Sequence, residues 1–95
     1  MVKISVPDLV SGADTVEEGR IIAAALASAL GEHDLVALSF AGIGSASSSF
    51  VTASLIPSLR RLGVDSFKRR IRIVESSWQI ADVIKRRVAL EHAAA

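Results

Sequence analysis

The stretch "LVALSFAGIGSASSSF", residues 35–50, decides the fold because it joins an apolar run to a serine-rich segment. Its first six residues, Leu35 to Phe40, are typical of a short strand that is buried on both faces. Helical spacing of apolar residues follows in "SFVTASLIPSLRRLG", residues 49–63, which ends on a glycine stop. The serines are therefore expected where a strand ends and a helix begins.

The same alternation of strand and helix continues on both sides of this stretch. Short strand patterns occur in "VKISV" and "IRIVE", residues 2–6 and 71–75. Helical patterns occur in "DTVEEGRIIAAALASALG", residues 14–31, and in "SSWQIADVIKRRVALEH", residues 76–92, with a serine N-cap at the start of the latter. The sequence therefore predicts an α/β fold with a mainly parallel, three- to four-stranded sheet and helices packed on it.

Some residues of the predicted helices carry additional expectations. Between Ile21 and Leu30 every residue except Ser28 is apolar, so this helix is either enclosed in the core or presents an apolar face to a partner. A homodimer through that helix or through an open sheet edge is one such arrangement. Pro57 is expected to kink its helix, and Trp78 to anchor the last helix against the sheet as a core or rim residue.

Composition narrows the classes of function. The chain has 95 residues, of which 51% are hydrophobic, with a net charge of +1 and no cysteine. This predicts a single domain over 1–95 without disulfides or thiolate metal sites. The balanced charge argues against nucleic-acid and membrane partners, and the missing signal peptide predicts a cytoplasmic protein. The ending at 91–95 fits either native helix, a remnant of an expression tag, or a disordered tail.

The serine-rich loop is open to three interpretations. Serines at a helix start can simply cap it. They can also carry or bind a phosphate beside the free N–H groups of the first turn, which makes a nucleotide- or anion-binding regulatory module the alternative function. Catalysis is not expected, because His33 and His92 lie in a turn and in the tail, and no metal or cofactor motif is present.

The segments "LVALSFAGIGSASSSFVTASLIPSLRRLG" and "FKRRIRIVESSWQIADVIKRRV", residues 35–63 and 67–88, resemble the STAS superfamily of bacterial anti-sigma-factor antagonists. They look most like a STAS-like family of unknown function found beside or fused to histidine-kinase-type ATPase domains. The resemblance implies a non-catalytic signalling domain that binds such an ATPase as its protein partner. It also implies a switch in which serine phosphorylation disrupts that interface.

The resemblance assigns roles to residues of the loop. Ser48 takes the position of the phosphorylated serine, and Ser47 is the alternative acceptor. The classical motif has an aspartate where this chain has Ala46 and a glycine where it has Ser49, so the family's acidic residue is missing. The other residues expected in the interacting loop and helix start are Gly44, Ser45, Phe50 and Thr52.

Overall fold

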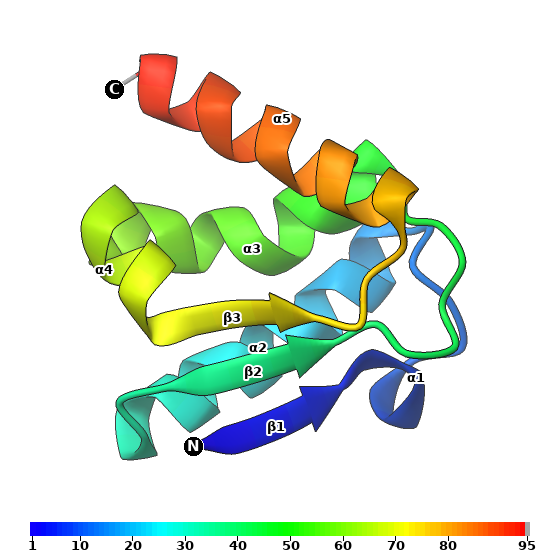
Figure 1. Cartoon of the computed structure of the whole chain (residues 1–95), viewed down its shortest axis with the longest axis horizontal. Helices are drawn as coiled ribbons and strands as arrows, with labels where there is room; N and C mark the ends of the chain where they lie inside the picture. The colour runs from blue at the N-terminus through cyan, green and yellow to red at the C-terminus, as the bar shows by residue number, and fades with distance from the viewer. Residues whose placement is uncertain (95) are drawn as a thin grey trace.

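Three parallel strands form one sheet in the order β1-β2-β3. The computed structural model describes residues 1–94. In chain order its elements are β1 (Val2–Ser5), α1 (Val6–Leu9), α2 (Val16–Glu32), β2 (Val36–Ser39), α3 (Ser48–Leu62), α4 (Val64–Arg70), β3 (Ile71–Val74) and α5 (Trp78–Ala94). The predicted α/β class with a mainly parallel sheet is confirmed, with three strands among the described residues (Figure 1).

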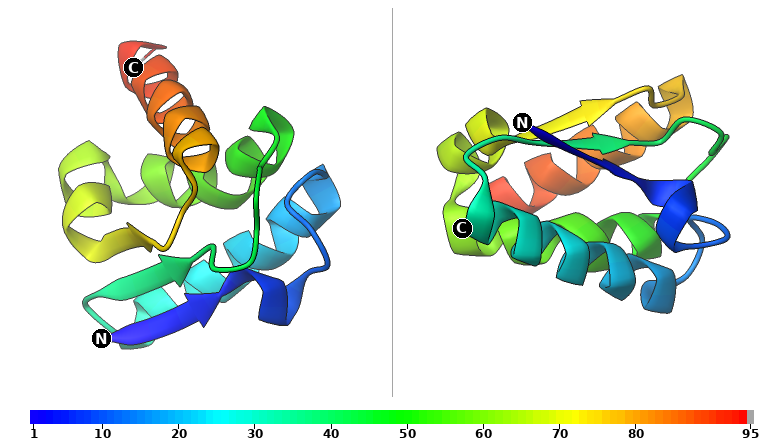
Figure 2. Two further views of the ribbon diagram at one scale, coloured as in Figure 1. Left: turned by 45° about the vertical axis from the view of Figure 1, so that its right-hand side comes forward. Right: turned by 90° about the horizontal axis from the view of Figure 1, so that it is seen from below.

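The long helices α2, α3 and α5 all lie on one side of the sheet (Figure 2, right). Strand register explains this layering, because successive side chains of a strand point to opposite faces. Val36 pairs with Val2 and Ile71, and this apolar row faces the helices. The next row, at Ala37, contains the exposed residues Lys3 and Arg72 and lies on the face that no helix covers. The four residues of β2 are buried as expected, but only one face of the strand meets helices.

The core fills the space between the sheet and the α2–α3 pair. Phe40, directly after β2, meets Phe50 of α3 edge to face, with ring centroids 6.3 Å apart and an interplanar angle of 77°. Ile22 and Leu26 of α2 are fully buried, whereas Ile21 of the same helix is 49% exposed. The Ala-rich helix therefore uses one face for the core and leaves the other in solvent.

Close helix packing depends on a glycine in α2. A Cβ atom placed on Gly19 would lie 2.7 Å from the Cβ of Ala53 and 2.8 Å from the backbone oxygen of Phe50. Both distances are shorter than any ordinary contact between such atoms, which is about 3.5–4.0 Å for carbon atoms. Gly19 thus lets α2 approach the first turns of α3, and it sets the position of the helix start that carries the serines.

The carboxyl end of α2 is held by a side chain from the end of α4. The guanidinium of Arg70 donates hydrogen bonds to the backbone oxygens of Leu30 (2.8 Å), His33 (3.0 Å) and Asp34 (3.1 Å). The last carbonyl groups of a helix have no partner within the helix, so a cation there is stabilising. This contact ties the end of α2 to the start of β3.

Several local expectations differ from the structure. Val6 belongs to α1, a single turn with Pro7 in its first positions, and not to the first strand. The prediction that Trp78 anchors α5 is wrong, because 85% of its surface is exposed and Ile80 provides the buried contact instead. Pro57 lies inside α3, which extends on both sides of it, and the kink expected there stays a prediction. No helix of residues 1–94 has both the length and the hydropathy to cross a membrane.

Candidate functional site

The serine loop leaves the carboxyl end of β2 and enters α3, as the sequence predicts. In open parallel sheets, ligand and partner sites are concentrated at this edge. Backbone and side-chain hydrogen bonds attach the loop to two other parts of the chain. Its position therefore depends on the segment before α2 and on the start of α5.

Ser47 is the N-cap of α3, and its hydroxyl is fully engaged. The Oγ atom accepts a hydrogen bond from the N–H of Phe50 at 3.1 Å and donates one to the backbone oxygen of Asp14 at 2.7 Å. The backbone N–H of Ser47 donates to the oxygen of Ala13 at 2.9 Å. Ser47 therefore caps the helix and also joins it to the entry of α2.

The start of α5 holds the other side of the loop. The side-chain amide of Gln79 accepts from the N–H of Ala46 at 2.9 Å and donates to the backbone oxygen of Ala46 at 3.1 Å. Ser77 donates to the backbone oxygen of Gly44 at 2.8 Å and caps α5 by accepting from the N–H of Ile80. Hydrogen bonds thus hold the loop between the segment before α2 and the start of α5.

The methyl group of Ala46 is 3% exposed and belongs to the hydrophobic core. The family resemblance puts an acidic residue at this position, and a carboxylate buried here would carry a large desolvation cost. Phe50 is fully buried as well. Ala46 and Phe50 pack into the core under the loop, whereas Gly44 and Ser45 are exposed residues of the loop.

Ser48 and Ser49 are the exposed hydroxyl groups of the first turn of α3. They line a surface hollow of about 520 Å³ together with Thr52 and two cations, Arg20 from α2 and Arg87 from α5. The Nε atom of Arg87 is buried and has no hydrogen-bond partner among the described residues. The hollow is therefore lined by three hydroxyl-bearing residues, two arginines and the apolar residues Val16, Ala53 and Pro57, at the positive end of the α3 dipole.

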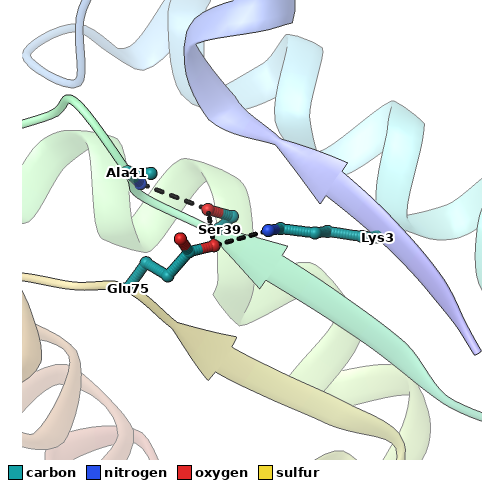
Figure 3. Close-up of polar contacts among 4 residues, drawn as sticks. All are labelled: Lys3, Ser39, Ala41 and Glu75. Carbon is teal, nitrogen blue, oxygen red and sulfur yellow. Dashed lines mark hydrogen bonds and ion pairs between the residues drawn. The ribbon is translucent and has the colours of Figure 1, made fainter.

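A second polar cluster lies beside the loop on the uncovered face of the sheet (Figure 3). Glu75 follows β3 and accepts from Ser39 Oγ at 2.8 Å, and its carboxylate also forms an ion pair with Lys3 at 2.6 Å. The hydrogen bond from Lys3, followed by that from Ser39, lowers the pKa of Glu75 below its ordinary value. Ser39 in turn accepts from the N–H of Ala41 at 3.2 Å.

This cluster joins all three strands at the edge from which the serine loop departs. Glu75 has a positive φ of 55°, a conformation that is uncommon for residues other than glycine. Ser39 is 1% exposed, so its hydroxyl is not open to a partner or substrate. The cluster thus ties the start of the loop to the sheet and encloses the Ser39 hydroxyl. Within residues 1–94, no group of three or more acidic or histidine side chains could hold a metal ion.

The structure brings together residues that the sequence pattern separates. The helical and loop patterns identify Ser47, Ser48 and Ser49, but Arg20 and Arg87 lie in other helices, with no local signal that links them to the loop. Gln79 is equally unmarked in the sequence. The pattern predicts a serine N-cap for the last helix, and the structure assigns this role to Ser77.

Comparisons of the chain with family models, with curated proteins and with solved structures find no match.

Proposed function

We propose that this domain is a non-catalytic signalling module that binds a histidine-kinase-type ATPase through the serine loop and the start of α3. In this proposal the protein is a cytoplasmic relative of anti-sigma-factor antagonists, and phosphorylation of Ser48 releases the partner. The observation that carries the proposal is the exposure of Ser48 at the first turn of α3, on a loop held from both sides.

The contacts of the loop favour Ser48 over Ser47 as the phosphate acceptor. Phosphorylation of Ser47 would displace its hydroxyl from the Asp14 carbonyl and the Phe50 amide, which together cap α3. Ser48 has no such engagement among the described side-chain hydrogen bonds, and it lines the same hollow as Arg20 and Arg87, whose positive charge favours an added phosphate. A phosphoryl group brings about 1.5 to 2 negative charges, which suffices to reshape a docking surface.

The test uses the intact chain with ATP and a purified histidine-kinase-type ATPase. We expect the mass to rise by one phosphoryl group in the natural chain and in Ser49→Ala, and to stay unchanged in Ser48→Ala. An unshifted natural chain, or a shift that persists when Ser47 and Ser48 are both replaced by alanine, would contradict the proposal. Circular dichroism of each variant verifies that it is folded.

Partner binding is measured separately with a charge mimic. Ser48→Glu adds negative charge in the first turn of α3, where a carboxylate stabilises a helix by about 0.3–1 kcal/mol. The variant should therefore remain folded while it loses affinity for the ATPase. Equal affinity of Ser48→Glu and Ser48→Ala for the ATPase would show that charge at this position does not control the interface.

A binding site for a free anion is the second candidate function, and the hollow beside Ser48 is the observation that favours it. Its two arginines and its position at the start of α3 match the groups that bind phosphate. Calorimetric titration with ATP, GTP and inorganic phosphate tests this function. Binding that Arg87→Gln abolishes would support it, and heats equal to buffer dilution would reject it.

A further inference from the structure

A groove runs along the outer edge of β3, on the far side of the molecule from the α2 helix. Two adjoining hollows form it, with volumes of about 470 and about 460 Å³, and they share Ile73, Ile84 and Lys85 as lining residues. The remaining apolar lining comes from α4, β3 and α5, namely Val64, Phe67, Ile71, Trp78 and Val88. We call this surface the β3–α5 groove.

The strand that borders the groove has unpaired backbone groups. β3 is an edge strand of the sheet, and among residues 1–94 only β2 pairs with it. The carbonyl of Val74 accepts from the N–H of Phe40 at 3.1 Å, so the backbone groups of Val74 point toward β2. Successive residues of a strand direct these groups to alternate sides, and those of Ile73 consequently point into the groove. An edge of this kind is a template for one more strand.

The side chains around this edge favour an apolar occupant with negative charge. Ile73 and Val88 are only half-buried, and Trp78, at the end of the groove, is 85% exposed. Lys68 and Lys85 are exposed lining residues, and neither forms an ion pair with the described part of the chain. The nearby carboxylate of Asp82 is already paired with Arg86 at 3.0 Å.

We propose that the β3–α5 groove binds an extended segment of a second protein, which pairs with β3 as a fourth strand. Strand addition satisfies the free backbone groups of Ile73, and the alternate side chains of the segment enter the groove. The segment carries apolar residues on that side and Asp or Glu at the positions that reach Lys68 and Lys85. A second copy of this chain fits less well, because two such edges would bring the same lysines together.

Trp78 is the only tryptophan of the chain, which makes its fluorescence a direct probe of the groove. The probes are a synthetic peptide whose groove-facing alternate residues are valines flanked by glutamates, with serine at the intervening positions, and a matched peptide with lysine in place of each glutamate. We expect the acidic peptide to shift the emission to the blue with saturation, and to bind about tenfold more tightly than the basic peptide, since two charge contacts change sign. An acidic peptide that is N-methylated at alternate residues lacks the donors for β3 and should not bind.

Charge reversal in the protein completes the test. Lys85→Glu should weaken the acidic peptide and favour the basic one, and combining it with Lys68→Glu should strengthen this reversal. Arg61→Glu is the matched control, because the substitution changes the charge by the same amount. Arg61 is also exposed and lines neither hollow. Ser48→Ala should bind the peptide normally, which separates this inference from the function proposed for the serine loop.

Four results would overturn the inference. They are an unchanged tryptophan emission with every peptide, equal binding of the N-methylated peptide, equal effects of Lys85→Glu and Arg61→Glu, and dimers in sedimentation experiments that the acidic peptide dissociates. The last result would assign the groove to a second copy of the chain.

Discussion

Replacing Gly19 by alanine should destabilise the domain, even though alanine is the better helix former. The new Cβ would lie 2.7 Å from the Cβ of Ala53 and 2.8 Å from the backbone oxygen of Phe50. Neither atom can rotate away, so α2 and α3 would have to separate by about 1 Å to restore ordinary contact distances. Overpacking of this kind costs about 1–3 kcal/mol, and the helix propensity of alanine returns about 1 kcal/mol.

The net expectation for Gly19→Ala is a loss of about 1–2 kcal/mol, because the clash involves main-chain atoms and lies at the costly end of that range. Urea unfolding followed by far-UV circular dichroism measures this loss. With a slope of about 1 kcal/mol per molar urea for a domain of this size, the midpoint should fall by about 1 M or more. Trp78 is unsuitable as the folding probe because it is exposed in the native state.

Gly31→Ala in the same helix is the matched control. A Cβ on Gly31 would meet nothing within 4 Å, so this variant should gain about 0.5–1 kcal/mol by restricting the unfolded chain. The double variant Gly19→Ala/Ala53→Gly should lose less unfolding free energy than the sum of the losses in the two single variants, since one of the two close contacts disappears. If Gly19→Ala were as stable as Gly31→Ala, the close packing of α2 on α3 would be refuted.

Two further predictions concern Glu75, whose contacts join the three strands, and Arg70, which caps the end of α2. The pKa of Glu75 is lower in the folded than in the unfolded chain, so its ion pair and hydrogen bond stabilise the fold fully above the ordinary pKa of a glutamate. This stabilisation is lost as the pH falls through the lowered pKa. Glu75→Gln should therefore be less stable than the natural chain at neutral pH, and acid titration should bring the two unfolding midpoints together; a constant difference down to low pH would contradict this. Arg70→Ala removes three hydrogen bonds to the end of α2 and should lower the unfolding free energy by about 1.5–3 kcal/mol, with partial recovery in Arg70→Lys. Hydrogen exchange at the last turn of α2 should accelerate in Arg70→Ala, and unchanged exchange there would show that the cap is dispensable.

Most of the fold follows from the pattern of apolar residues, because the long helices have a helical period, β1 and β3 come from short strand patterns, and β2 lies in an apolar run. Thr15 caps α2 at the start of the predicted range, and Gly63 ends α3 as predicted. The single turn α1 was missed, since four residues are too few to establish a helical period. The exposure of Trp78 was also missed, because the preference of tryptophan for burial carries no information on whether a neighbouring strand is present to cover it.

The candidate site was predicted only as far as its local part. Serines before a helix indicate an N-cap, but the pattern does not tell which hydroxyl is used for capping and which remains exposed. The assignment of Ser47 to the cap depends on the carbonyl of Asp14, which is 33 residues away in the sequence. Likewise, Arg20 and Arg87 reach the hollow only because α2 and α5 pack on either side of α3. Contacts of this range depend on packing and have no periodic signature.

The register of the sheet also affects the order in which parts of the chain are expected to fold. Val2 pairs with Val36 and Val36 pairs with Ile71, so the strand partners are 36 − 2 = 34 and 71 − 36 = 35 residues apart. No hairpin can form early and serve as a template, and each pairing has to close a long loop first. The helices α2 and α3 make the most extensive contact in the molecule, and their interface can assemble before the strands align. We therefore expect the sheet to form late in folding, and until it closes, the edges of β2 are open to other unfolded chains.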